Sequence, residues 1–231
     1  MSTVAIIPAR GNSKRLPHKN IKLFSGKPLI YYTVNFAKAQ KNIDYIVVST
    51  DNEEIKNVVQ NFGVDVIDRP EELAGDFTST AAVITHTMEQ LKQQDMQFDL
   101  IATLQATNPL RPANLFKQCY DLINNNEEAD SVICVSKNER KNGTVNNGFF
   151  VPTNYSFGQR SQDLTPQFYE NGLLYLTKNI FLEKSGMLCG ANALAYEVDE
   201  KFPIIDIDYQ IDFELGEIIL QKNIHLFNHL L

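Results

Sequence analysis

The chain has 231 residues, and its 28 Asp and Glu outnumber its 21 Lys and Arg, which gives a formal net charge of −7. This acidic balance argues against nucleic-acid binding, and no apolar stretch is long enough to span a bilayer or to act as a signal peptide. The three cysteines, Cys119, Cys134 and Cys189, show no C-x-x-C spacing, so we expect no disulfide framework and a reducing, cytoplasmic setting. With 43% hydrophobic residues, the chain is expected to form a single domain over residues 1–231.

The first predicted element is a short apolar strand, residues 4–7, which leads into a loop rich in cations. Gly11, Ser13 and Asn20 suit a close approach of backbone to a ligand. A loop after a buried strand can surround phosphates with N–H groups and lysines. We therefore predict a bound polyanion, with a solvated basic loop as the alternative. The stretch from residue 10 to residue 27, called the basic loop below, has no Asp or Glu and six cations: Arg10, Lys14, Arg15, Lys19, Lys22 and Lys27.

Short apolar strands and amphipathic helices alternate from residue 28 to residue 135. Continuous apolar runs are typical of strands buried on both faces of a parallel sheet. The alternation predicts a doubly wound, mainly parallel α/β fold, whose ligands bind beyond the carboxyl ends of the strands. Strands are predicted at residues 45–51, 64–67, 99–104 and 131–135, and helices are predicted to begin near Pro28, Asn52, Thr80 and Asn114.

Two polar segments lie where such a fold binds ligands. Residues 105–111 follow the strand at 99–104, at its carboxyl end. Ser79 and its threonine neighbours precede a helix, where they either cap the helix or hold a ligand at its N-terminus. The basic loop itself contains neither the Walker A pattern nor G-x-G-x-x-G, so a nucleotide would be held by a differently shaped loop.

From residue 136 to residue 165 the helical periodicity stops, and glycines punctuate a run of Asn, Lys, Tyr and Phe. This segment, called the arm below, is predicted to form hairpins. Strand patterns return at residues 172–176 and 192–198. The last helix carries His225 and His229 at i, i+4, a spacing that permits metal binding but more often serves packing or a surface.

Asp206 and Asp208 alternate with isoleucine near the C-terminus. Alternation in an extended segment places both carboxylates on one face and Ile207 on the other. Adjacent carboxylates repel, and a divalent cation between them and a phosphate relieves that repulsion. A solvated pair on an exposed edge is the alternative.

The basic loop from Arg10 to Asn20 resembles the signature of the N-acylneuraminate cytidylyltransferases, the CMP-sialic acid synthetase family. The resemblance extends in order over residues 49–51, 69–76, 104–111, 160–164, 171–172 and 205–208, and so covers essentially the whole chain. It implies a nucleotide-diphospho-sugar transferase-like fold and a homodimer in which the arm reaches the partner's active site. The implied reaction transfers CMP from CTP to a nine-carbon 2-keto-3-deoxy sugar acid and releases pyrophosphate.

The resemblance also implies a role for individual residues. Lys14, Lys19 and Asp208 are the expected catalytic residues, and the group that accepts the proton of the sugar hydroxyl is not identified. CTP is expected to contact Arg10, Gly11, Asn20 and either Ser79 or Thr80; the sugar is expected to contact Gln105, Thr107 and Arg160; Mg²⁺ is expected to bind Asp206 and Asp208.

The departures from the family pattern lie on the sugar side. The arm is short, residues 138–143 lack a proline-bearing segment common in relatives, and Tyr169-Glu170 stands where some N-acetylneuraminate enzymes carry arginine. The acceptor therefore stays open among N-acetylneuraminate, its deaminated analogue, legionaminate and pseudaminate. A nucleotidyltransferase for an eight-carbon keto acid or a sugar 1-phosphate, and a non-catalytic nucleotide-binding protein, are the rival functions.

Overall fold

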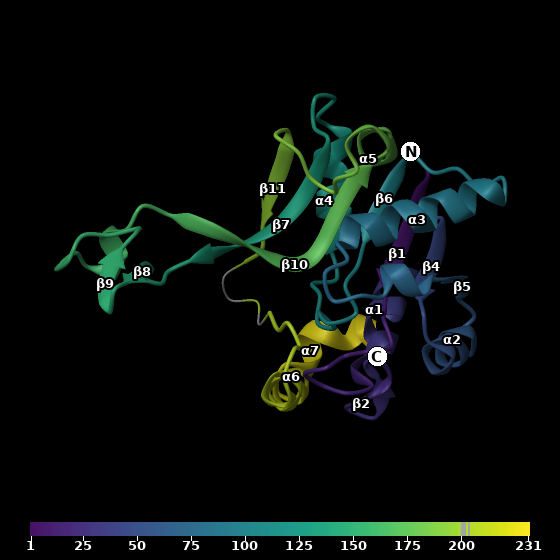
Figure 1. Ribbon diagram of the computed structural model, residues 1–231, viewed down its shortest axis with the longest axis horizontal. Helices are drawn as coiled ribbons and strands as arrows, with labels where there is room; N and C mark the ends of the chain where they lie inside the picture. The colour runs from purple at the N-terminus through teal and green to yellow at the C-terminus, as the bar shows by residue number, and fades with distance from the viewer. Residues whose placement is uncertain (200–201, 203) are drawn as a thin grey trace.

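The computed structural model describes residues 1–199, 202 and 204–231. Its centre is a seven-stranded sheet with the strand order β11-β7-β10-β6-β1-β4-β5 (Figure 1). All neighbouring strands are parallel except β10, which runs antiparallel to both β6 and β7. The strands are β1 (Thr3–Pro8), β4 (Tyr45–Thr50), β5 (Asp65–Asp68), β6 (Leu100–Thr103), β7 (Ser131–Asn138), β10 (Gln167–Lys178) and β11 (Ala193–Glu197).

Helices connect these strands and cover both faces of the sheet. The longer helices are α1 (Leu29–Lys38), α2 (Glu53–Gln60), α3 (Thr80–Gln93), α4 (Leu115–Asn124) and α6 (Gln210–Lys222); the shorter ones are α5 (Asn179–Ser185) and α7 (Ile224–Phe227). Two small two-stranded sheets add β2 (Leu23–Phe24) with β3 (Lys27–Pro28) and β8 (Gly143–Asn146) with β9 (Phe149–Pro152). The predicted doubly wound, mainly parallel α/β architecture is confirmed.

The strand β1 shows why the sheet is buried on both sides. Val4 and Ile6 pack with α3 and α5 on one face, whereas Ala5 and Ile7 pack with α1, α4 and α6 on the other. All four residues are fully buried. A continuous apolar run is therefore required here, because successive side chains of a strand point to opposite faces.

The order of the strands fixes where a ligand can bind. From β1 the chain moves outward to β4 and β5 on one side, then returns through α3 to β6 on the other side of β1. In open α/β sheets a crevice forms at such a reversal, beyond the carboxyl ends of the two strands. The basic loop leaves β1 at this point, and residues 105–111 leave β6 beside it.

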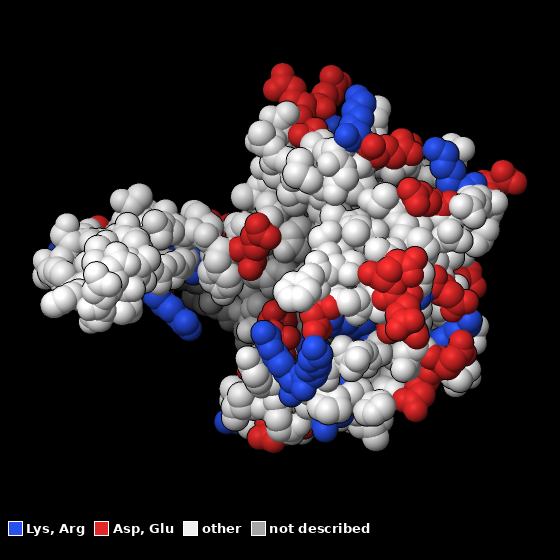
Figure 2. Space-filling view, in the orientation of Figure 1, with Lys and Arg blue, Asp and Glu red and all other residues white. Residues whose placement is uncertain are grey.

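The arm projects from the body as an extension of β7 and β10 (Figure 1). These two strands pair as far as Asn138 and Gln167, and β8 and β9 form a hairpin at the far end. The hairpin prediction is confirmed. Phe149 and Phe157 in the arm are 76% and 73% exposed, and most of the arm's visible surface carries no charge (Figure 2).

The C-terminal region contains the acidic segment and the two histidines that the sequence analysis singled out. Residues 204–208 form no strand, although they are extended enough that Ile207 is buried while its acidic neighbours face the crevice. His229 packs against the loop after β6, with its Nε2 2.8 Å from the carbonyl oxygen of Arg111. Among the described residues, no cluster of three potential metal-ligating His, Cys, Asp or Glu occurs. In that same part of the chain, no helix has the length and apolar character needed to cross a bilayer.

Candidate active site

A cavity of about 620 Å³ lies at the reversal of strand order. Four segments line it: the basic loop, residues 69–80, residues 105–107, and an acidic segment formed by residues 206–208. Three of these four follow strands β1, β5 and β6, and the fourth precedes α6. The fold thus brings residues from both ends of the chain into one cavity, where basic and acidic side chains lie together below the centre of the face shown in Figure 2.

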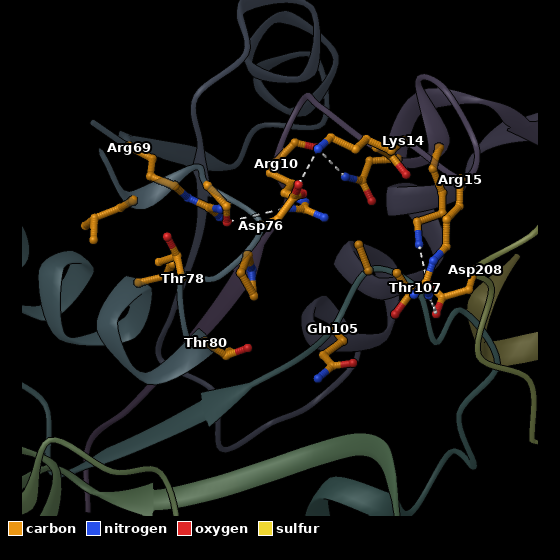
Figure 3. Close-up of a pocket in the computed structure, with 18 of the residues that line it drawn as sticks. Arg10, Lys14, Arg15, Arg69, Asp76, Thr78, Thr80, Gln105, Thr107 and Asp208 are labelled. Atoms are coloured by element: carbon orange, nitrogen blue, oxygen red, sulfur yellow. Dashed lines mark hydrogen bonds and ion pairs between the residues drawn. The ribbon is translucent and has the colours of Figure 1, made fainter. Parts of the chain in front are cut away.

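One side of the cavity holds Arg10, Lys14 and Asp76 (Figure 3). Arg10 Nη1 lies 3.0 Å from Asp76 Oδ1, and Lys14 Nζ lies 2.5 Å from Asp76 Oδ2. The hydrogen bond from Lys14, together with the charge of Arg10, holds the pKa of the Asp76 carboxyl below its ordinary value. Asn20 is buried and donates from Nδ2 to the carbonyl oxygen of Arg10 at 2.9 Å, which fixes the start of the basic loop.

A second cluster forms around Asp208. Arg15 Nη1 lies 2.9 Å from Asp208 Oδ2, and Lys19 Nζ lies 3.0 Å from Asp208 Oδ1. The Lys19 side chain is only 9% exposed, and its ammonium group also donates to the carbonyl oxygen of Ile207 at 2.7 Å. A buried ammonium needs such partners, because burial without them is costly. Lys19 therefore connects the basic loop to the acidic segment.

Asp206 lies in the same cavity, and its pKa is raised. Burial in the recess is the main cause, the nearby charge of Asp208 adds to it, and a hydrogen bond from Thr107 opposes it. The backbone fixes this neighbourhood, because the N–H of Ile207 donates to the carbonyl oxygen of Thr107 at 2.9 Å. A nearby cation would stabilise the charged form of this carboxylate, which its surroundings otherwise disfavour.

This raised pKa predicts a pH-dependent stability. The folded protein holds a proton on Asp206 more readily than the unfolded chain, so wild type loses stability as the pH rises from 3.8 through the raised pKa. We expect Asp206→Asn to be more stable than wild type at pH 7, by less than about 1 kcal/mol because solvent reaches the cavity. The difference should vanish below pH 3.8.

Urea unfolding between pH 3.5 and pH 7 (~0.3-unit steps) measures this difference. Asp208→Asn is the matched comparison, because it removes a neighbouring carboxylate that has two ion-pair partners. A stability gain at pH 7 in Asp208→Asn, or none in Asp206→Asn, would contradict this assignment.

The loop that carries Gln105 is held by Arg111. This arginine is fully buried, yet its three hydrogen-bond partners are neutral oxygens: Leu173 O at 2.8 Å, Thr33 Oγ1 at 2.9 Å and Gln105 O at 2.7 Å. Burial lowers the pKa of Arg111 to about 9, so the guanidinium stays charged at neutral pH. It ties the loop after β6 to α1 and to the irregular part of β10, and thereby positions Gln105.

A smaller cavity of about 330 Å³ adjoins the first one, and Thr80 and Gln105 line both. Glu170 and Tyr175 stand on its polar side, where the tyrosine hydroxyl donates to Glu170 Oε2 at 3.0 Å. Its remaining lining is mostly apolar and comes from Ala81 and residues 187–189. A ligand in the main cavity can therefore extend past Gln105 into a partly apolar recess.

The structure brings together most of the predicted site residues. Those that line the main cavity are Arg10, Lys14, Lys19, Asn20, Thr80, Gln105, Thr107, Asp206 and Asp208.

Three predicted residues lie outside this lining. Gly11 donates its N–H to Asp51 Oδ1 at 2.9 Å, so its role is in the turn. Ser79 Oγ accepts from the N–H of Ala82 at 3.2 Å and caps α3, so of the two alternatives given for Ser79 the structure shows the cap. Arg160 lies in the arm, where it pairs with Asp163 at 2.8 Å. It is outside the lining because the arm leads away from the chain's own cavity.

Arg15, Arg69 and Asp76 also line the cavity, although none of them was assigned an individual role from the sequence. Thr78, one of the threonines beside Ser79, lines it as well. The basic-loop count included Arg15, but its partner Asp208 is 193 residues away in the chain. Arg69 is buried and donates to Ser49 O at 2.7 Å, which keeps a further cation at the cavity wall. In the sequence, only the family resemblance of residues 69–76 indicates this part of the wall.

A doubly wound sheet with a cationic loop after β1 and a facing carboxylate pair defines a nucleotide-binding transferase. The family model for cytidylyltransferases matches residues 4–224, and the chain belongs to that family of nucleotidyltransferases. It is 32% identical to a pseudaminic acid cytidylyltransferase from Campylobacter jejuni, over 96% of this chain and 98% of that one. It is also 28% identical to an N-acylneuraminate cytidylyltransferase from Escherichia coli, over 95% of this chain and 52% of the relative.

A solved structure of CMP:2-keto-3-deoxy-manno-octonic acid synthetase complexed with CTP has the same fold. Its TM-score is 0.73 at 16% sequence identity, and the match covers 96% of this chain and 99% of that one. At this identity the likeness concerns the fold alone. The predicted family resemblance is confirmed by the family model and by the two relatives.

Proposed function

We propose that this cytidylyltransferase transfers CMP from CTP to the anomeric hydroxyl of a nine-carbon 2-keto-3-deoxy sugar acid and releases pyrophosphate. The proposal is carried by one observation: the cavity that holds the cationic wall and the carboxylate pair adjoins, past Gln105, a partly apolar recess with Glu170 and Tyr175 on its polar side. The names of the two curated relatives, which act on pseudaminic acid and N-acylneuraminate, support an acidic sugar as acceptor.

The cationic wall suits the triphosphate of CTP. Three positive charges in the cavity come from Arg10, Lys14 and Lys19. In the proposed complex these side chains bind the negative oxygens of the phosphates. Phosphoryl and nucleotidyl transfer depend mainly on positioning and on stabilising charge. Arg15 and the buried Arg69 add to the positive field from the same cavity.

The carboxylate pair suits Mg²⁺. Asp206 and Asp208 both line the cavity, carboxylate oxygens are the ligands that Mg²⁺ prefers, and the raised pKa of Asp206 reflects a charge that a cation would stabilise. When bound, Mg²⁺ would supply positive charge against the α-phosphate and the leaving pyrophosphate. We propose this pair as its ligands.

In the proposed reaction the anomeric oxygen forms a bond to the α-phosphorus, and the bond between that phosphorus and the bridging oxygen of pyrophosphate breaks. Lys14 and Lys19 stabilise the charge that grows on the phosphate oxygens. Gln105 and Thr107 position the sugar beside the α-phosphate from the loop that Arg111 holds. The hydroxyl proton leaves to a group that the proposal does not specify.

A homodimer is proposed to complete the sugar end of the site. Arg160 sits in the arm and does not reach its own cavity, so contact with the sugar requires a partner's arm. Exposed aromatic side chains give the arm an apolar surface to bury.

Replacing both Phe149 and Phe157 with aspartate should convert the dimer to monomers at micromolar concentration and lower turnover. Both side chains are exposed in the single chain, so each protomer should keep its fold. Light scattering measures the mass, and Ile180→Asp is the control, because Ile180 is an exposed apolar residue on α5, outside the arm. If the variant stayed dimeric, the arm would not be part of the dimer interface.

A panel of sugar acids with CTP and Mg²⁺, scored by pyrophosphate release, tests the function and the acceptor together. The proposal expects release with at least one of N-acetylneuraminate, its deaminated analogue, legionaminate and pseudaminate. Release only with an eight-carbon keto acid or a sugar 1-phosphate would favour the rival transferases. CTP binding without release from any acceptor would favour a non-catalytic role.

A further inference from the structure

Asp76 bridges two cations of the cavity at once. Its two carboxylate oxygens lie 3.0 Å from Arg10 Nη1 and 2.5 Å from Lys14 Nζ, and Arg10 also donates to the carbonyl oxygen of Gly75 at 3.4 Å. Figure 3 shows these three side chains pointing toward one another at the cavity wall, across from Gln105 and Thr80. The contact joins the basic loop to residues 69–79, which lead from β5 to α3.

The bridge contributes little to the stability of the fold. The Lys14 side chain is 72% exposed and that of Asp76 is 38% exposed, and ion pairs between exposed side chains contribute only about 0–1 kcal/mol. The bridge instead orients the side chains of Arg10 and Lys14. Both remain directed at the cavity, in a pairing weak enough to be exchanged for a stronger anion.

The same two cations are those that the proposed function assigns to the triphosphate. A carboxylate and a phosphate both present anionic oxygens at hydrogen-bonding distance from a guanidinium or an ammonium. We propose that Asp76 is a positioning residue that competes with the triphosphate: it orients Arg10 and Lys14 before the nucleotide binds, yields them to the phosphates, and regains them as pyrophosphate leaves. This inference rests on the proposed function.

Competition of this kind has two measurable consequences. Removing the carboxylate frees Arg10 and Lys14, so CTP and pyrophosphate should both bind more tightly. Tighter retention of pyrophosphate should slow turnover once its release limits the rate, so KM for CTP and kcat should fall together. A residue that only braces the loop would raise KM or lower stability instead.

The test is calorimetric titration of CTP, and separately of pyrophosphate, into wild type, Asp76→Asn and Asp76→Ala. Both variants should lower Kd by about 3- to 10-fold, the range expected when one or two exposed ion pairs no longer compete. The matched control is Asp121→Asn, because Asp121 lies outside the cavity lining and pairs with Lys117 at 2.5 Å with similar exposure. This control should leave both Kd values unchanged.

Unchanged or weaker binding in both Asp76 variants would overturn the inference while leaving the proposed function intact. A wild-type protein that binds neither CTP nor pyrophosphate would overturn both. Pyrophosphate product inhibition in the full reaction gives the second readout: its inhibition constant should fall in the Asp76 variants and not in Asp121→Asn.

Discussion

Replacing Asp208 with asparagine should lower kcat by about 1,000-fold while the protein stays folded. The substitution keeps the shape of the side chain but removes the charge that is proposed to hold Mg²⁺ and that pairs with Arg15 and Lys19. Pyrophosphate release at saturating CTP and acceptor measures the loss, and thermal unfolding shows whether the fold survives.

Glu214→Gln is the control for removal of one negative charge nearby. Glu214 is exposed on α6 and accepts from Gln210 at 2.8 Å, outside the cavity lining. It should keep near-normal activity. Near-normal turnover in folded Asp208→Asn would show that the metal assignment is wrong.

Lys19→Met should lower kcat by about 100-fold or more, because it removes a charge placed to stabilise the transition state. The methionine side chain has a similar length and suits the buried position, yet it leaves the carbonyl of Ile207 and one oxygen of Asp208 without their ammonium partner. Some stability should also be lost, because an unpaired buried polar group costs about 1–3 kcal/mol.

Lys27→Met separates this effect from a general loss of positive charge in the basic loop. Lys27 is exposed and its ammonium lies 5.4 Å from the centroid of the Tyr31 ring, away from the cavity lining. It should retain wild-type kcat. If Lys19→Met and Lys27→Met behaved alike, the cluster around Asp208 would have no special part in the reaction.

Much of the fold follows from local pattern. The run from Val4 to Ile7 is apolar at every position because both faces of β1 are covered, and α2 begins where Asn52 accepts from the N–H of Ile55. The insertion of β10 between β6 and β7 in the antiparallel direction was not predictable in this way. The sequence of a strand restricts which of its faces are buried, but not which strand becomes its neighbour.

In the site, too, local sequence pattern predicts some features, while others depend on tertiary structure. Alternation around Ile207 predicted that Asp206 and Asp208 share a face, and the cavity contains both. The cation partners of this carboxylate pair depend on tertiary structure, because Arg15 reaches Asp208 across 193 positions of the chain. Local spacing carries no information on such long-range pairing, so the basic loop could be recognised but the role of each cation could not.

Transfer of CMP from CTP to a sugar acid can be followed by ³¹P NMR of the reaction mixture. With CTP, Mg²⁺ and an accepted nine-carbon sugar acid, the three CTP resonances should give way to one phosphodiester resonance and that of pyrophosphate in equal molar amounts. Formation of CDP, CMP or orthophosphate without a phosphodiester, with every acceptor of the panel, would show that the enzyme does not catalyse the proposed transfer.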